Sequence, residues 1–422
     1  MIGLAPSRGR RHQAEQSLDE LGGLVAAAGG RASLRMIQER PQPDPATFVG
    51  RGKLHELSLA CDEQRIDLVV VDHELTPTQL RHLDEVLGRR VIDRTQLILD
   101  IFARRARTRE GQSQVELAQL QYLLPRLTGR GVELSRLGGG IGTRGPGETK
   151  LETDRRRIRQ RIATISATID AIRQRRTRLR ERRQKSAVPT VALVGYTNAG
   201  KTTLFNLLTR GAAEVSDALF VTLDPLVRRV RLPDQRELLI SDTVGFIDRL
   251  PHALVAAFRA TLEEVREADV LLHVIDASAE DRARRMAAVH AVLEEVDADE
   301  VPCIDVYNKA DRLDADERQR LEQAADAGIV ISALHGQGQQ ELLERLTERL
   351  GLDTSRVTLR LDPDSDAGRR GMAWVYRHGR VVSHTNRRGR ACIEADVSRR
   401  LFAAFRKSMA GVSRHALSMG PA

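Results

Sequence analysis

One eight-residue segment constrains the fold of this chain more than any other part of its 422 residues. The apolar run TVALVG leads into Gly195-Tyr-Thr-Asn-Ala-Gly-Lys-Thr202, and the apolar segment LFNLL follows directly. This is the spacing GxxxxGK[ST] between a strand and a helix, the setting in which backbone N–H groups cradle phosphates. A chance match in that setting has a probability below about 5%. The segment therefore predicts a phosphate-binding loop in an α/β domain with a mainly parallel sheet.

Individual roles follow from the chemistry of this loop. We expect Lys201 to bridge the β- and γ-phosphates of a nucleotide and the Thr202 hydroxyl to bind Mg²⁺. The predicted nucleotide-binding residues of the segment are Gly195, Tyr196, Thr197, Asn198, Ala199, Gly200, Lys201, Thr202 and Thr203.

Two later segments predict the parts that sense a γ-phosphate. Asp242-Thr-Val-Gly245 follows the strand-like run ELLIS, so the Asp242 carboxylate can reach Mg²⁺ through water and the Gly245 N–H can meet a γ-phosphate. Thr222, in ALFVTLDP between the loop and this segment, is the best candidate to close over Mg²⁺ and the γ-phosphate. Its alternative is an ordinary loop threonine.

Two further segments predict the choice of base. Asn308-Lys309-Ala-Asp311 follows VPCIDVY, and the Asp311 carboxylate can accept hydrogen bonds from N1–H and the 2-amino group of guanine. Adenine does not offer that pattern of donors, so the segment favours GTP over ATP. Ser332-Ala333 follows GIVI and can present a backbone N–H to the guanine O6. We therefore expect GTP as the substrate and Mg²⁺ as the cofactor.

Two positions depart from the commonest pattern of small GTPases. The residue after Gly245 is Phe246 rather than a water-orienting Gln, so we expect slow intrinsic hydrolysis. Other GTPases that have a hydrophobic residue at the position of Phe246 use an Asn in the phosphate loop to bind K⁺ beside the phosphates. Asn198 resembles that Asn. Lys201, Thr222, Gly245 and Asn198 are thus the candidate catalytic residues, and K⁺-stimulated hydrolysis is a hypothesis.

The positive charge of the chain is concentrated in one segment. Residues 155–185 hold twelve Arg and one Lys against two acidic residues, a local charge of 13 − 2 = +11, while the whole chain carries +9. The apolar residues of this segment repeat at heptad-like spacing and predict one long helix with a single apolar stripe. They are Leu151, Ile158, Ile162, Ile165, Ile169, Ile172 and Leu179.

A partner for that stripe lies upstream. Leucines at 117, 120, 124 and 127 repeat at helical spacing, and Pro125 is expected to kink or end their helix. The two helices predict a hairpin whose tip is the glycine-rich loop Leu137–Gly147. Such a density of one charge favours contact with the phosphate backbone of structured RNA over a dimerising coiled coil.

The tip also contains Gly140-x-Gly142-x-x-Gly145, the spacing of a dinucleotide-binding loop. We reject that interpretation because the segment follows a helix rather than a strand and continues into Pro146. Gly50-Arg51-Gly52-Lys53 likewise lacks the full spacing of a phosphate loop and predicts a turn that opens a helix.

These stretches together resemble the HflX family of translational GTPases, from about residue 15 to about residue 350. The resemblance rests on the following segments: FVGRGK at 48–53, DRTQLILDIFARRA at 93–106, QVELAQLQYLLPRL at 114–127, LSRLGGGIGTRGPGETKLETDRR at 134–156, GYTNAGKTTLFN at 195–206, LFVTLDP at 219–225 and DTVGFIDRLPHALVAAFRATLEE at 242–264. It implies binding to ribosomal RNA of the large ribosomal subunit by the glycine tip and the basic helix. It also implies GTPase activity stimulated there and a role in splitting stalled or idle ribosomes.

The predicted architecture is an α/β chain with a Ras-like P-loop G domain. Four parts are expected: an N-terminal α/β domain over 1–108, the helical hairpin over 109–187, the G domain over 188–352 and a small α+β module over 353–422. In the first part we expect strands in MIGLAP, RASLRMIQ and DLVVVD and helices in LDELGGLVAAA, KLHELSLAC and TPTQLRHLDEVL. In the last, VTLRLDP, MAWVYRHGRVVSH and RACIEADV are expected to be strands.

Composition narrows the cellular setting. Three widely spaced cysteines, Cys61, Cys303 and Cys392, support neither a disulfide framework nor a zinc site. The apolar stretch at the N-terminus is too short for a signal peptide. No segment approaches the length of a membrane span. We expect a cytoplasmic monomer that binds GTP and GDP. The alternatives are a GTPase of another RNA, in transfer-RNA modification or subunit maturation, and a nucleotide-gated scaffold whose long helix dimerises.

Overall fold

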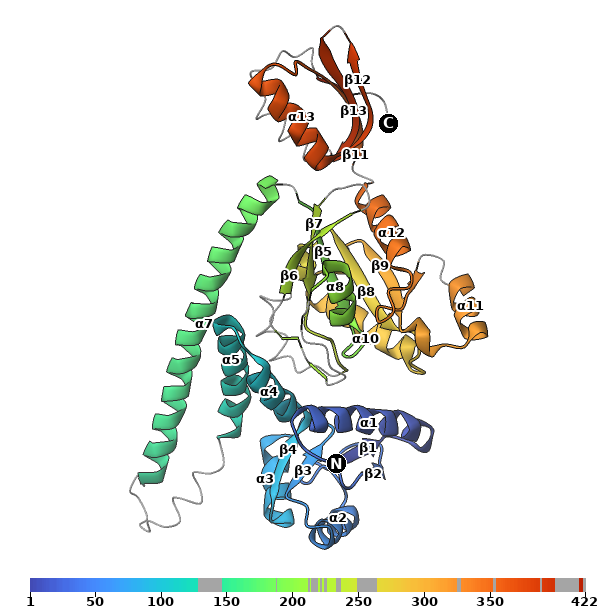
Figure 1. Cartoon of the computed structure of the whole chain (residues 1–422). Coiled ribbons are helices and arrows are strands. Elements are labelled where there is room, and N and C mark those ends of the chain that lie inside the picture. The colour runs from blue at the N-terminus through green and yellow to red at the C-terminus, as the bar shows by residue number, and fades with distance from the viewer. Residues whose placement is uncertain are drawn as a thin grey trace. The chain divides into compact units, whose positions relative to one another are not determined.

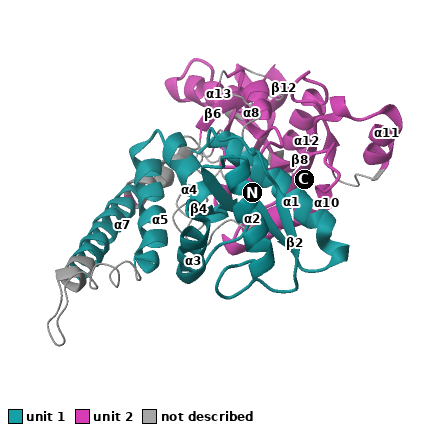
Figure 2. Cartoon of the chain, turned by 90° about the horizontal axis from the view of Figure 1, so that it is seen from below, with its two compact units in different colours: residues 1–173, 216–224, 249–260 teal, residues 174–215, 225–248, 261–422 magenta. Residues whose placement is uncertain are grey.

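Two compact units divide the chain in this computed structural model, and Figure 2 colours them separately. The structure describes residues 1–127, 146–186, 188–211, 213, 219–220, 222–223, 226–232, 237–248, 264–324, 328–351, 354–387, 389–398 and 417–419. The first unit holds Met1–Arg173, Ser216–Asp224 and Arg249–Ala260. The second holds Gln174–Val215, Pro225–Asp248 and Thr261–Ala422.

The first unit begins with a four-stranded parallel sheet in the order β2-β1-β3-β4. Its elements are β1 Ile2–Ala5, the short helix η1 Arg8–Arg10, α1 Arg11–Ala27, β2 Met36–Glu39, α2 Arg51–Glu63, β3 Leu68–Val71, α3 Pro77–Leu87, β4 Arg90–Asp93 and α4 Arg94–Arg105. The strands predicted from MIGLAP, RASLRMIQ and DLVVVD and the three predicted helices are all present. Strand β4 was not predicted, because RVID offers only two apolar residues and no alternation.

Buried charges fix the end of β4 to its surroundings. Arg94 is 2% exposed and forms ion pairs with Asp72, at 2.9 Å, and with Glu20. A buried guanidinium requires such partners, since an unpaired charge in the interior is strongly destabilising. Asp93 is fully buried and accepts hydrogen bonds from the backbone N–H groups of Leu75 and Gln96, at 3.0 and 2.8 Å.

The hairpin helices are α5 Arg109–Arg126 and α7 Pro146–Ser186, and Figure 1 shows α7 as one long, uninterrupted helix. Tyr122 of α5 donates a hydrogen bond to Asp93 at 2.9 Å, which joins the hairpin to the sheet. Pro125 lies in the last turn of α5, one residue before its end, where its missing N–H cannot donate the i→i−4 hydrogen bond of a continuing helix. The predicted glycine tip falls mostly outside the described residues, which resume at Pro146.

The predicted apolar seam joins α5 to α7. Leu117, Ile165 and Ile169 are buried in one cluster, with Leu120 and Ile162 packed against it. At its edge, Arg161 of α7 forms a two-pronged ion pair with Glu116 of α5, at 2.7 and 2.9 Å. The heptad-like spacing in the sequence therefore corresponds to packing within one hairpin.

A short piece of the sequence between the phosphate loop and Asp242 also lies in the first unit. Phe220 is 3% exposed and meets Phe102 of α4 edge to face, with ring centroids 4.6 Å apart. Gly23 of α1 has no side chain, which makes room for Leu219. A Cβ atom at Gly23 would lie only 3.1 Å from that leucine. Thr222 belongs to the same piece.

The second unit contains a six-stranded sheet in the order β10-β9-β8-β5-β7-β6, parallel except for β6. Its elements are β5 Thr190–Gly195, α8 Lys201–Thr209, β6 Leu226–Arg231, β7 Glu237–Asp242, β8 Val270–Asp276, α10 Arg282–Glu295, β9 Cys303–Asn308, the short helix η2 Ala310–Arg312, α11 Ala315–Ala324, β10 Ile329–Val330 and α12 Gln339–Gly351.

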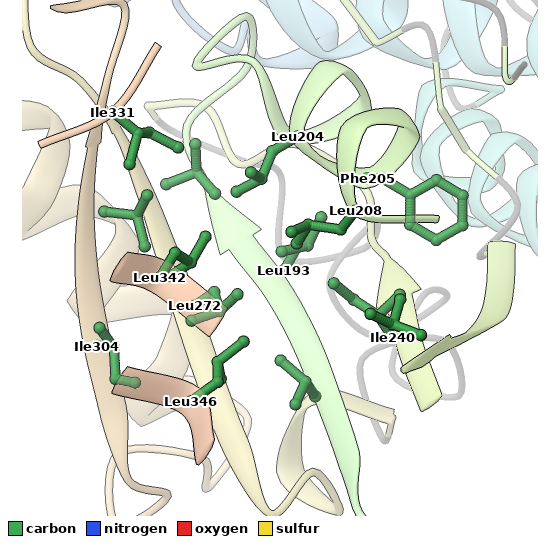
Figure 3. Packing of buried hydrophobic residues seen from close by; sticks show 14 of the residues in the cluster. Leu193, Leu204, Phe205, Leu208, Ile240, Leu272, Ile304, Ile331, Leu342 and Leu346 are labelled. Atoms are coloured by element: carbon green, nitrogen blue, oxygen red, sulfur yellow. The ribbon is translucent and has the colours of Figure 1, made fainter. Parts of the chain in front are cut away.

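Helices α8 and α12 pack on one face of this sheet, around the core shown in Figure 3. Leu204 and Phe205 of α8 and Leu342 of α12 meet strand residues such as Leu272 there. Helix α10 contacts β5 and β8 from the other face, where His273 of β8 meets His290 with ring centroids 5.3 Å apart. The carboxyl ends of the parallel strands thus converge at one edge, which is where ligands bind in such sheets.

The C-terminal module is an antiparallel sheet in the order β12-β13-β11-β14 with one helix. Its elements are β11 Thr354–Leu361, α13 Asp366–His378, β12 Gly379–Arg387, β13 Arg390–Ser398 and β14 Leu417–Met419. The prediction of a strand throughout MAWVYRHGRVVSH was wrong in its first half, which is helical. Ser365 caps that helix by accepting from Gly368 N–H, and Val375 is fully buried on its inner face. None of the described helices could cross a membrane.

Candidate nucleotide-binding site

Two glycines fix the path of the loop between β5 and α8. Gly200 has φ +94°, and a Cβ atom there would lie 2.2 Å from the Asn308 amide nitrogen. Gly195 has φ +149°, and a Cβ atom there would lie 2.3 Å from the Val274 carbonyl oxygen. Both positions therefore require glycine. The loop leads into the N-terminus of α8, whose orphan N–H groups and dipole favour phosphate.

Lys201 lies inside the loop and is only 7% exposed. Its ammonium donates hydrogen bonds to the carbonyl oxygens of Gly195 and Tyr196, at 3.1 and 2.9 Å. Burial lowers the pKa of Lys201 from 10.5 to about 8, although the nearby Asp242 carboxylate raises it. Anionic phosphates at this position would restore the full charge of the ammonium.

Thr202 and Asp242 provide oxygen atoms suited to a hard cation. The Thr202 hydroxyl donates to Asp242 Oδ2 at 2.8 Å, and Asp242 is fully buried at the end of β7. The next residue is held by a hydrogen bond from the Thr243 hydroxyl to the Leu193 carbonyl, at 2.5 Å. A hydroxyl and a carboxylate side by side fit Mg²⁺, which prefers oxygen ligands and uses few protein groups beside substrate phosphates.

Asn308 connects the base-recognition segments to the phosphate loop. Its amide nitrogen donates to the Ala199 carbonyl at 2.9 Å, and its amide oxygen accepts from Ala333 N–H at 2.9 Å. Asp311 is exposed and accepts from the Ser332 hydroxyl at 2.5 Å. The structure thus brings the phosphate loop together with two later segments, the nearer of which follows it by 109 residues. The Ala333 N–H expected to meet guanine O6 here donates to Asn308.

Sequence reasoning missed Asp276, which lies beside Lys309. Its carboxylate accepts from the Lys309 ammonium at 2.7 Å and from the Ser278 hydroxyl at 2.7 Å. Burial opposes ionisation of Asp276, but the hydrogen bonds from Lys309 and Ser278 outweigh it and lower its pKa. The available signal was its position at the carboxyl end of β8, beside the strand that precedes Asn308.

Other candidate residues lie around the loop. Asn198 is exposed and has φ +58°, a conformation that Asn tolerates better than most residues. Thr197 is buried, and Thr203 lies in the first turn of α8. Thr222 lies in the first unit, whereas Thr202 and Asp242 lie in the second. Its role as a ligand of Mg²⁺ therefore stays a prediction.

Comparison with known families agrees with this geometry. The family described as "GTP-binding GTPase N-terminal" matches residues 15–103, and "GTP-binding GTPase Middle Region" matches residues 105–183. A third family, "50S ribosome-binding GTPase", matches residues 190–309 and so covers β5 through Lys309. Together these three matches cover most of the chain.

Curated relatives extend over the same parts. GTPase HflX of Caldanaerobacter subterraneus subsp. tengcongensis is 49% identical over 344 residues, covering 82% of this chain and 79% of the relative. GTPase HflX of Escherichia coli K12 is 48% identical over 350 residues, covering 82% of each chain. GTPase HflX of Lacrimispora saccharolytica is 43% identical over 404 residues, covering 96% of this chain and 94% of the relative.

Among solved structures, a GTP-binding protein from Sulfolobus solfataricus in complex with GDP is 23% identical, with a TM-score of 0.41 over 82% of this chain and 97% of that one. The nucleotide site and the curated relatives establish this protein as an enzyme that hydrolyses GTP. The Ras-like P-loop domain follows the matched N-terminal and middle regions, and the chain belongs to the HflX family of GTPases.

Proposed function

We propose that this GTPase binds the large ribosomal subunit through its α5–α7 hairpin and couples its nucleotide state to separation of the ribosomal subunits. The observation that carries the proposal is the cationic surface of α7. Residues 155–185 have a net charge of +11, and α5 covers the apolar stripe of the helix at Ile162, Ile165 and Ile169. The outward faces of α7 are therefore available for a polyanion.

Exposed arginines make that surface suitable for RNA. Arg156, Arg157 and Arg159 are exposed on α7, away from the buried Ile165 and Ile169. Guanidinium groups bind phosphate with two parallel hydrogen bonds, so a row of them suits a ribosomal RNA backbone. The family that matches residues 190–309 is that of 50S ribosome-binding GTPases, which supports the large subunit as the partner.

In the G domain, the chain's own residues would orient the triphosphate. Lys201 would contact the β- and γ-phosphates, and Thr202, Asp242 and Thr222 would hold Mg²⁺, which neutralises charge on the phosphate oxygens when bound. Asp311 and Asn308 would select guanine. Phe246 offers no hydrogen-bonding group, so another group must orient the attacking water, and contact with the ribosome is the proposed source of stimulation.

The test is light scattering of intact ribosomes mixed with the full-length protein, which we expect to act as a monomer in the cytoplasm. With GTP or a non-hydrolysable analogue, scattering should fall as subunits separate, whereas GDP should leave it unchanged. In parallel, GTP turnover should rise with purified large subunits but not with bulk transfer RNA. Stimulation by transfer RNA alone would favour a GTPase of another RNA and contradict this proposal.

A further inference from the structure

The segment that follows β7 pairs with the phosphate loop. Thr197 N–H donates to the Phe246 carbonyl at 2.7 Å, and Phe246 N–H donates to the Gly195 carbonyl at 3.1 Å. These two bonds form a parallel bridge between Tyr196 and Phe246. The Phe246 side chain is 2% exposed, so its burial adds apolar stabilisation to the same contact.

This pairing brings Gly245 against the side of the loop that should meet the γ-phosphate. A Cβ atom on Gly245 would lie 2.9 Å from Thr197 Cγ2 and 3.0 Å from the Lys201 ammonium. In GTPases of this fold, the loop lysine contacts the β- and γ-phosphates, and the switch segments are ordered by contacts with the γ-phosphate. Here the Gly245 backbone packs closely beside Thr197 and the Lys201 ammonium, which leaves little room for a γ-phosphate next to that ammonium.

A second set of contacts holds the same segment from the outside. Asp248 N–H donates to the Tyr196 hydroxyl at 2.9 Å, and the Asp248 carboxylate forms an ion pair with Arg284 of α10. Arg284 also donates to Asp281 at 2.5 Å, which fixes its guanidinium at the start of α10. The Arg285 guanidinium lies 5.3 Å from the centre of the Tyr196 ring.

We propose that Tyr196, Asp248 and Arg284 form a switch clamp that holds residues 245–248 against the phosphate loop when no γ-phosphate is present. GTP binding has to open this clamp, whereas GDP binding leaves it closed. The three are positioning residues that set the preference between GDP and GTP. This clamp acts in the isolated protein and does not depend on the ribosome.

The sign of the effect follows from the geometry. Each contact of the switch clamp stabilises the state that excludes a γ-phosphate, so removing one lowers the cost of binding GTP relative to GDP. Arg284 and Asp248 side chains are 33% and 22% exposed, so their ion pair is partly screened by water. We expect removal of this pair to shift the ratio of the two affinities by about fivefold toward GTP.

The experiment measures the affinity of the full-length protein for fluorescent GDP and for a fluorescent non-hydrolysable GTP analogue, both with Mg²⁺. Arg284→Gln and Asp248→Asn should each raise the ratio of analogue to GDP affinity about fivefold. Arg282→Gln is the matched control: it removes an arginine of the same helix that donates to the Ala277 carbonyl at 2.9 Å and does not belong to the clamp. Its ratio should match that of the wild type.

A loss of general stability would lower both affinities together and leave their ratio unchanged, so an unchanged ratio in Arg284→Gln and Asp248→Asn would overturn the proposal. A shift toward GDP would also overturn it. Tyr196→Phe is an independent test of the clamp, because it removes only the hydroxyl that accepts a hydrogen bond from Asp248 N–H. Its shift should be less than additive with that of Arg284→Gln, because both act on the same segment.

Discussion

Burial of Lys201 gives nucleotide binding a pH dependence that belongs to a single residue. Its pKa is about 8 in the folded protein without ligand, and phosphates must raise it because they favour the charged ammonium. Above pH 8, binding should therefore take up a proton, and affinity should fall as pH rises. Calorimetry at pH 8.5 in two buffers of different ionisation enthalpy should detect that uptake. At pH 6.5, where Lys201 is already charged, this lysine should contribute almost no uptake.

Replacing Lys201 separates its role toward the ligand from its role in stability. Lys201→Ala should abolish GTP turnover, because the lost ammonium contacts phosphates. The folded-state pKa is lowered, so the charged lysine destabilises the protein below about pH 8, and this penalty is relieved as pH rises toward 10.5. Melting of Lys201→Ala at pH 7 should therefore occur at the wild-type temperature or above it. A lower melting temperature would contradict this reasoning.

Asn198 offers a test of cation dependence at the phosphate loop. Its side chain is exposed and its backbone holds a left-handed conformation, so the amide is available beside the phosphates. GTP turnover should be faster in KCl than in NaCl at equal ionic strength, and Asn198→Ala should reduce that difference. Equal rates in the two salts, or a full K⁺ effect in the variant, would exclude a K⁺ site involving Asn198.

Among the elements, α7 carries the charge on which ribosome binding is proposed to depend. Replacing Arg156, Arg157 and Arg159 together with Gln should weaken ribosome binding and flatten its salt dependence, since fewer counterions are released from RNA. Intrinsic GTP hydrolysis should stay at the wild-type rate. The affinity for large subunits is measured at a series of KCl concentrations, and the slope of log affinity against log salt concentration is compared with that of the wild type.

A triple variant of equal charge provides the control for α7. Arg81, Arg318 and Arg369 lie on α3, α11 and α13, with side chains 41% to 58% exposed. Replacing these three with Gln changes the net charge equally but leaves α7 intact, so the salt slope should stay as in the wild type. An equal loss of slope in both triple variants would mean that overall charge, and not α7, governs binding.

At the scale of the whole molecule, Phe220 ties part of the G-domain sequence into the first unit. Phe220→Ala would leave a cavity beside Phe102 and should destabilise that unit by about 3 kcal/mol. Hydrogen exchange should become faster in α4 while β5 and β8 keep their protection. Leu334→Ala, at a side chain that is 71% exposed, should leave exchange in α4 unchanged. Unchanged exchange in Phe220→Ala would rule out this anchoring role.

The local sequence pattern was sufficient to predict the features that depend on residues close together in the chain. The phosphate loop of 195–202 could be predicted because its glycines, lysine and threonine act within one turn between β5 and α8. The seam of the hairpin could be predicted because 3.6 residues per turn place Ile162, Ile165 and Ile169 on one face. In each case the residues that form the feature lie within a few positions of one another, so the amino-acid order alone determined the loop and the seam.

Tertiary structure decided the features that depend on residues distant in sequence. Strand β4 is four residues long and gains its hydrogen bonds from β3, which no pattern within RVID could reveal. The first half of MAWVYRHGRVVSH continues a helix that Ser365 caps upstream, and Val375 packs into the core formed with the strands of the module. The pairing of Asp276 with Lys309, and of Asp248 with Tyr196 and Arg284, arises only where separate strands and helices converge. Such contacts are created by chain folding across tens of residues, so composition and spacing do not encode them locally.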